Sequence, residues 1–376
     1  MAMNAPAITI RSGELVALRL FDIAYGIDLT QSESLWAAHV GGTTSRTHLA
    51  STPTKAIAFE VPPLRLSLDP IDLMLGSEKV VTEASVRLYD FGVAALAVRV
   101  KVTDISWDTF VERFDALDQA AGPDTPAPFW LTLLDHVREV IAPALDRPAL
   151  DARLQEDYLL GSVYAFDEVV DAASLSERVD LIRLLSGETR PLSAAARRDL
   201  LSRSFSYYAD DLAVLTWDRA FIYEPRGDSD VADVIEVANA QLVEFRYYDT
   251  LLDDELPRMY DRVEAARHLS SLFASRRFAH LARHLHTLVA EVTQLTEKVD
   301  NALQVTEDVY LSRVYSAALG LFRVPTLNAS VDRKLAIIRD TYAALYDEAS
   351  SRRAELLEII IIVLIITEIA VTLLLH

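Results

Sequence analysis

Apolar and polar residues alternate in short runs through the first hundred residues, a pattern typical of β-strands bounded by turns. We expect strands over 14–21, 55–60, 64–68, 80–89 and 92–102. The pattern then changes to helical spacing, which predicts helices over 107–120 and 128–144, and it returns to alternation over 154–166. This order of elements predicts a mixed αβ region.

Two short helices are expected next, over 175–185 and 193–202. Residues 211–224 then read as two strands folded about Trp217-Asp218-Arg219. The residues that follow, Pro225, Gly227, Asp228 and Ser229, are turn formers and predict a linker. The first domain is therefore placed at 1–225.

Beyond residue 230 the apolar residues recur every three or four positions, which indicates helices. A long helix is expected from 231 to about 268, and Gly320 and Pro325 separate two later seams of coiled-coil spacing. Together these helices form a predicted antiparallel bundle or coiled-coil hairpin over 230–355. Spacing alone does not distinguish pairing within one chain from pairing between chains, and an intrachain bundle that also self-associates is favoured. The seams consist of Leu281, Leu285, Leu288, Val292, Leu295, Val299 and Ala302, and of Val331, Leu335, Ile338, Tyr342, Leu345 and Ala349.

The chain closes with a run rich in isoleucine and leucine, and residues 356–375 are predicted to form a transmembrane anchor. The alternative is a buried helix of a globular domain. Arg352 and Arg353 precede the run, so the positive-inside rule places the N-terminal bulk in the cytoplasm. The expected location is that of a tail-anchored, single-pass protein of a bacterial inner membrane, with lipid as a partner.

Glu368 lies inside this apolar run, where an isolated carboxylate is costly. One interpretation is a protonated carboxyl that bonds to Thr367 or Glu368 of another copy and drives oligomerisation. The other is that Glu368 only tunes insertion and reaches toward headgroups. The predicted fold class is thus α+β: a mixed αβ domain, an antiparallel helical bundle and one C-terminal transmembrane helix.

Charge and composition narrow the function. The chain has 56 acidic against 36 Lys and Arg residues, a net charge of −20, so direct nucleic-acid binding is not expected. Cysteine is absent, which excludes disulfides and thiolate metal sites, and no cofactor is expected. The nearest candidates for a local basic patch are Arg197, Arg198, Arg203, Arg276 and Arg277.

The sharpest candidate for chemistry is the pair His280 and His284, one helical turn apart, with His268 and His286 nearby. The pair lacks the glutamate of the H-E-x-x-H metal motif, and a solvated helix face explains it equally well. No phosphate-binding or nucleophile motif is present, and an enzyme is not expected. The acidic runs Asp210-Asp211 and Asp253-Asp254-Glu255 read as solvated surface, and the aromatic residues Phe205, Tyr207, Tyr208, Phe245, Tyr247 and Tyr248 as packing positions.

Four segments resemble the required-for-meiotic-nuclear-division family, a group built around a domain of unknown function with Sad1-interacting and mitochondrial members. They are RLYDFGVAALAVRV, LTWDRAFIYE, DVIEVANAQLVEFRYYDTLLDDEL and RRAELLEIIIIVLIITEI. The chain departs from that family where Phe-Trp is usual and Ala95-Leu96-Ala97-Val98 stands, which suggests a distant bacterial-type branch. The resemblance implies a membrane-anchored, homo-oligomeric, non-enzymatic protein, and mitochondrial relatives support organellar translation.

The function expected from the sequence is therefore a membrane-anchored scaffolding or oligomerising protein that acts with an unknown protein partner. Two alternatives remain. One is a membrane-attached metal-dependent enzyme that uses His280 and His284, or the acids of the hairpin, as ligands. The other is a ribosome or RNA tether, as in the mitochondrial relatives.

Overall fold

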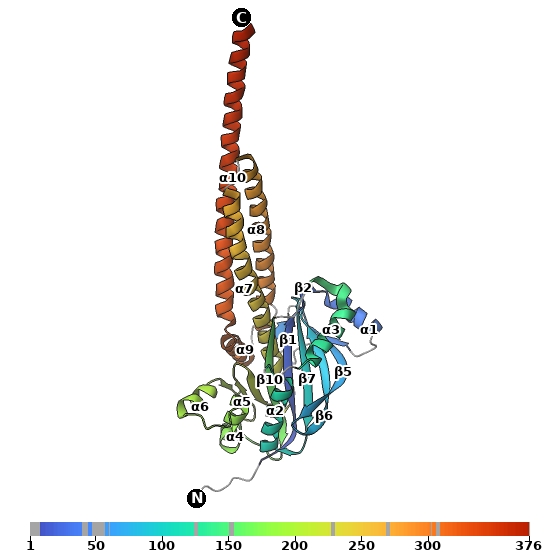
Figure 1. Cartoon of the computed structure of the whole chain (residues 1–376). Coiled ribbons are helices and arrows are strands. Elements are labelled where there is room, and N and C mark those ends of the chain that lie inside the picture. Colours follow the sequence, from blue (N-terminus) through green and yellow to red (C-terminus); the bar gives the residue numbers. More distant parts are fainter. Residues whose placement is uncertain are drawn as a thin grey trace. The chain divides into compact units, whose positions relative to one another are not determined.

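The computed structural model describes residues 8–39, 44–46, 57–59, 61–123, 127–149, 154–226, 230–267, 271–301, 303–305 and 309–375. The chain divides into two compact units. The sheet unit comprises residues 1–244 and 298–325, and the helical unit comprises 245–297 and 326–376. Figure 1 shows the strands of the former and the long helices of the latter.

A ten-stranded sheet, in the order β11-β12-β13-β10-β1-β7-β6-β5-β3 with β8 beside β1, forms the sheet unit. Neighbouring strands are antiparallel except for β10 and β13, which are parallel. Two smaller pairs, β2 with β9 and β4 with β14, lie outside it. The strands are β1 (Thr9–Asp22), β2 (Ala24–Ile27), β3 (Thr44–Arg46), β4 (Ile57–Phe59), β5 (Leu64–Leu75), β6 (Glu78–Leu88), β7 (Val93–Val102), β8 (Ile105–Ser106), β9 (Leu145–Pro148), β10 (Gln155–Phe166), β11 (Ser204–Phe205), β12 (Leu212–Leu215), β13 (Arg219–Tyr223) and β14 (Leu303–Val305).

One face of the sheet carries the main hydrophobic core, because alternate residues of its strands are apolar and pack against helices. Helix α2 begins where the Ser106 side chain accepts a hydrogen bond from the Thr109 amide, a standard N-cap. Its Phe110 and Phe114 approach β10 at Gly161, where the absent side chain makes room. The other helices of this unit are α1 (Leu29–His39), α2 (Trp107–Ala121), α3 (Phe129–Ile141), the 3-10 turn η1 (Ala142–Ala144), α4 (Ala172–Arg178), α5 (Leu181–Ser186), α6 (Ala194–Leu200) and α9 (Val309–Leu321).

The opposite face is covered by the first part of α7 (Val231–Arg267), in which every residue from 234 to 245 is buried. Small residues on β7, Ala95 and Ala97, leave room for a helix to approach the sheet. Gln241 ties this helix to later parts of the same unit, since its amide donates to the Val299 carbonyl and it accepts from the Tyr315 hydroxyl, both at 2.6 Å. Helix α7 is therefore enclosed on several sides.

The helical unit contains the second part of α7, α8 (Ser271–Asp300) and α10 (Val324–Leu375), which lie side by side in Figure 1. The predicted seam residues Leu285, Val292, Val331 and Ile338 are each at most 2% exposed. These seams are therefore buried within one chain. Lys334 of α10 bonds to Asp249 and Asp253 of α7 at 2.7 and 2.6 Å, and these hydrogen bonds outweigh partial burial and raise the pKa of the Lys334 ammonium.

Most predicted elements are present. The helices expected over 107–120 and 128–144, the strand over 154–166, the hairpin over 211–224 and the breaks at Gly320 and Pro325 are confirmed by α2, α3, β10, β12 with β13, and the boundary between α9 and α10. Helix α1 was not predicted. Gly227, Asp228, Ser229, His268 and Ala302 lie outside the described residues, as does most of the strand expected over 55–60.

The predicted transmembrane anchor is wrong: within the described part of the chain, no helix is both long enough and apolar enough to cross a membrane. The predicted span also contains two carboxylates, Glu358 and Glu368, each of which is costly in a hydrocarbon core. The predicted fold class, which ended in that span, is therefore wrong, as is the tail-anchored inner-membrane location. The structure is a mixed α+β protein with a large sheet and many helices.

Candidate functional site

The C-terminal part of α10 presents a continuous apolar surface that its own chain leaves uncovered. Its large aliphatic residues are between 48 and 62% exposed. Exposed apolar surface on this scale usually marks a contact site. The residues, which we call the apolar end of α10, are Leu357, Ile359, Ile360, Ile361, Ile362, Val363, Leu364, Ile365, Ile366, Ile369 and Val371.

The apolar end continues the register of the helical unit. The seam residues of α10 recur at alternating intervals of four and three residues. They are Val331, Leu335, Ile338, Tyr342 and Leu345, and all except the half-buried Tyr342 are buried. Extending the same intervals along α10 reaches Ile359, Val363 and Ile366. The register passes Arg352 on the way, so the apolar seam is interrupted there and resumes at Ile359.

Two polar residues predicted for this interface, Thr367 and Glu368, lie within the apolar end of α10. The Thr367 hydroxyl donates to the Val363 carbonyl at 2.7 Å, so its proton is used within the helix and its oxygen remains an acceptor. The Glu368 side chain is exposed, and its backbone carbonyl accepts from the Thr372 hydroxyl at 2.8 Å. The side chains of Arg352 and Arg353 lie outside the described residues.

His280 and His284 lie exposed on α8. Nε2 of His284 is 3.4 Å from Oε1 of Glu255, a carboxylate that also pairs with Arg262 at 3.0 Å. Across the described parts of the chain, no group of three or more His, Cys, Asp or Glu side chains is arranged to hold a metal ion. Among the described residues, the predicted pair therefore has no third ligand placed beside it.

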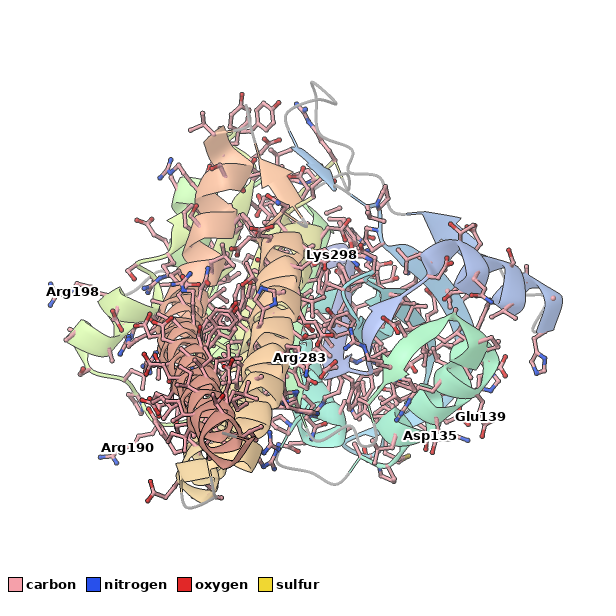
Figure 2. All side chains as sticks on the ribbon, turned by 90° about the horizontal axis from the view of Figure 1, so that it is seen from above. Asp135, Glu139, Arg190, Arg198, Arg283 and Lys298 are labelled. Atoms are coloured by element: carbon pink, nitrogen blue, oxygen red, sulfur yellow. The ribbon has the colours of Figure 1, made fainter. Side chains whose placement is uncertain are left out.

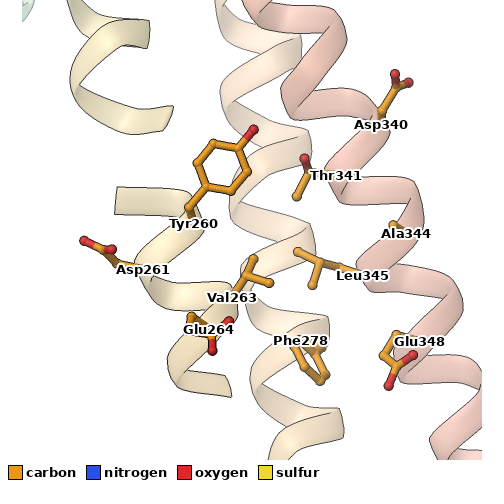
Figure 3. A pocket seen from close by; sticks show the side chains of 10 residues that line it. All are labelled: Tyr260, Asp261, Val263, Glu264, Phe278, Asp340, Thr341, Ala344, Leu345 and Glu348. Carbon is orange, nitrogen blue, oxygen red and sulfur yellow. The ribbon is translucent and has the colours of Figure 1, made fainter. Parts of the chain in front are cut away.

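A groove of about 1070 Å³ is formed by α7, α8 and α10 within the helical unit (Figure 3). Phe278 and Leu345 form its buried apolar base, at 1% and 5% exposure. Carboxylates lie along the groove, and no Lys, Arg or His is among the described residues that line it. The lining residues are Tyr260, Asp261, Val263, Glu264, Phe278, Asp340, Thr341, Ala344, Leu345 and Glu348.

A buried ion-pair network joins the sheet to α7. The Arg87 guanidinium on β6 lies 2.8 Å from Asp233 and 3.2 Å from Glu236, and the Tyr89 hydroxyl donates to Glu236 at 2.9 Å. Burial opposes the charge on Arg87, but the two carboxylates outweigh it and raise the pKa of the guanidinium. Burial, followed by the charge of Glu236, raises the pKa of the Tyr89 phenol. These groups hold one another, so the network is structural.

A second buried arginine, Arg219, lies on the opposite face of the sheet. Its guanidinium bonds to Asp118 and Asp115 of α2 at 2.5 and 3.2 Å and donates to the Leu184 carbonyl at 3.1 Å. Burial raises the pKa of the neighbouring Asp218 carboxyl. The predicted hairpin therefore supplies a cation that fixes α2 and α5 rather than ligands for chemistry.

The aromatic residues divide into two groups. Phe245 and Tyr248 are fully buried, which confirms their predicted packing role. Tyr207 and Tyr208 are 65% and 43% exposed, so that prediction is wrong for them.

The charged residues singled out from the sequence of the sheet unit differ in their exposure to solvent. Asp211 is buried and accepts from the Tyr207 amide at 2.7 Å, contrary to the predicted solvated surface. Arg197, Arg198 and Arg203 are exposed on or after α6, with Arg198 shown in Figure 2. The side chains of Arg276 and Arg277 lie outside the described residues.

Asp22, at the end of β1, is buried, and the Ala24 amide donates a hydrogen bond to its carboxylate. Burial raises the pKa of its carboxyl to about 7, and the amide opposes this only in part. The folded state therefore holds this proton at pH values where the unfolded chain has lost it. Stability contributed by the neutral carboxyl is present below pH 4 and is lost as the pH rises to 7.

We expect Asp22→Asn to stabilise the protein above pH 7 and to change little near pH 4. The raised pKa corresponds to at most about 4 kcal/mol of unfolding free energy. Urea unfolding should be followed by tryptophan fluorescence between pH 4 and 8, because all four tryptophans lie in the sheet unit. Equal pH dependence in the variant and the parent chain would show that Asp22 does not titrate in this range.

The fold and its surfaces define a mixed α+β protein with an exposed apolar helix end and a groove lined by carboxylates. The chain belongs to the family described as "Uncharacterized protein MJ0711, N-terminal domain", whose model matches residues 12–230. It is 23% identical over 215 residues to uncharacterized protein MJ0711 of Methanocaldococcus jannaschii. That match covers 56% of this chain and 65% of the relative, just under two thirds of its length. No solved structure matches the chain.

This family replaces the one suggested by the sequence motifs, and the resemblance to the required-for-meiotic-nuclear-division family is wrong. The physical reason lies in the motifs themselves. RLYDFGVAALAVRV is a buried strand pair with its turn, and the isoleucine-rich run is an apolar helix. Such segments are built from residues that many unrelated strands and helices share.

Proposed function

We propose that this chain is a non-enzymatic scaffolding protein whose copies associate through the apolar end of α10. The observation that carries the proposal is the run of eleven large aliphatic residues that the chain's own helices leave 48–62% exposed. Burying each such side chain is worth about 1.5 to 3 kcal/mol, so association has a strong driving force. The continued seam register through Ile359, Val363 and Ile366 supports a helix of another copy as the occupant.

The distribution of these residues supports an assembly of three or more copies. The consecutive residues Ile359 to Leu364 point to all sides of the helix, since each step rotates it by about 100°. A two-stranded pairing would cover one side and leave the others in water.

The test is the mass of the full chain in detergent-free buffer, measured by light scattering after size exclusion. We expect the parent chain to elute as a multimer and Ile359→Asp with Ile366→Asp to elute as a monomer, because a carboxylate in the seam would be buried. The control replaces two aliphatic residues of the sheet unit that are also exposed, Val81→Asp and Leu131→Asp, at 70% and 51% exposure.

The control pair should leave the mass unchanged. A parent chain that is monomeric, or a multimer that survives the Ile359 and Ile366 substitutions, would contradict the proposal. Flotation of the chain with phosphatidylcholine vesicles in place of self-association would also contradict it, because lipid rather than another copy would then cover the apolar end.

A further inference from the structure

The groove of the helical unit has the form of a bundle that lacks one helix. Helices α7 and α10 form its sides and Phe278 of α8 closes its base (Figure 3). Its volume is about 1070 Å³. We propose that this groove binds a basic amphipathic helix of a partner protein.

The apolar part of the groove selects an amphipathic partner. Phe278 and Leu345 are already buried, and Val263, Thr341 and Ala344 surround them with small or branched side chains. A helix with leucine at every third or fourth position would place its apolar side chains against this base. Packing of this kind is how a fourth helix completes a bundle.

The charge of the groove selects a basic partner. Asp261 on α7 and Asp340 on α10 are exposed on its two sides, and neither forms an ion pair with a described residue. Glu264 and Glu348 also line the groove, but each already has an interaction within the chain, so the selection of a basic partner depends on the other two carboxylates. A partner with Lys or Arg flanking its apolar stripe would neutralise both sides at once, whereas an acidic helix would be repelled.

The apolar end of α10 from a second copy is a poor occupant, because carboxylates on the groove would repel its own carboxylates. Its described residues, 357–372, contain Glu358 and Glu368 and no Lys or Arg. The groove and the apolar end are therefore separate surfaces with different partners. The two proposals can fail independently, since one is tested by self-association and the other by binding of a foreign helix.

The test measures binding of a fluorescent synthetic peptide of about 18 residues, with leucine on one face and lysine on the other, to the full chain by anisotropy. We expect the leucine–lysine peptide to bind and its leucine–glutamate counterpart not to bind. Asp261→Lys with Asp340→Lys should weaken binding at least about tenfold. Ala344→Trp, which fills the groove without changing charge, should weaken it similarly.

The matched control reverses the same number of charges outside the groove. Asp135 and Glu139 are exposed on α3 of the sheet unit (Figure 2), so Asp135→Lys with Glu139→Lys makes the same change in net charge. Binding should be nearly unchanged in this variant. Equal weakening in both charge variants, or full binding by Ala344→Trp, would show that the peptide responds to the overall acidity of the chain and would overturn the proposal.

Discussion

Arg87→Met should destabilise the sheet unit by about 3 to 5 kcal/mol of unfolding free energy. The Arg87 side chain is only 8% exposed, and its removal leaves the Glu236 carboxylate, at 6%, buried without its cation. Asp233 loses its guanidinium partner as well. Urea unfolding followed by tryptophan fluorescence reports this loss directly, because the tryptophans belong to the sheet unit.

A double variant separates the loss of the pair from the loss of packing. Arg87→Met combined with Glu236→Gln removes both charges and keeps similar volumes, so it should recover much of the stability lost in the single variant. If the double variant is as unstable as Arg87→Met, an uncompensated carboxylate is not the cause, and the methylene stem of Arg87 accounts for the effect instead.

Gly92→Ala should cost about 3 kcal/mol or more, or prevent folding altogether. Gly92 forms the turn between β6 and β7 with φ at +104°, and an added Cβ would lie 1.8 Å from the Ala24 carbonyl oxygen. That oxygen belongs to the backbone and has no side-chain freedom with which to move away. The change should appear as a lower urea midpoint and as less folded protein.

Gly76→Ala is the control for this substitution. Gly76 also has a positive φ, +62°, in the turn between β5 and β6, but an added Cβ there meets nothing within 4 Å. Only the cost of holding alanine in a left-handed backbone conformation remains, about 1 kcal/mol of unfolding free energy. Equal losses for the two variants would mean that Ala24 is farther from the turn than described.

The sequence predicted elements well wherever one face of a segment is apolar and the other polar. The coiled-coil spacing of Leu285, Val292 and Ile338 located the helices of the bundle, and all three are buried. Helix α1 was missed because its buried residues, Leu29, Ser32 and Trp36, include a serine and give a weak apolar pattern. The periodicity of apolar residues does not predict such helices.

The first part of α7 shows a different limit. Asn239, Gln241 and Glu244 are polar yet at most 2% exposed, because the sheet and later segments of the chain enclose the helix. A sequence pattern assigns such residues to solvent, and only the fold reveals that they are buried. The Arg87 network was missed for the same reason, since its two halves are separated by about 150 residues of chain.

The candidate surfaces were predictable only in part. The apolar run of α10 was recognised from composition, but its assignment to a membrane was wrong. The groove could not be predicted, because Asp261 and Asp340 belong to helices that are adjacent only after folding. Their individual positions in sequence look like ordinary solvated acids.

The hydrogen bonds of Gln241 can form only after later parts of the chain have been synthesised. Its two partners, Val299 and Tyr315, are 58 and 74 residues later in the chain. At the roughly 5 to 20 residues per second of a ribosome, the first part of α7 waits about 4 to 15 s for the segment that completes its enclosure. During that interval the nascent chain holds an unfinished core.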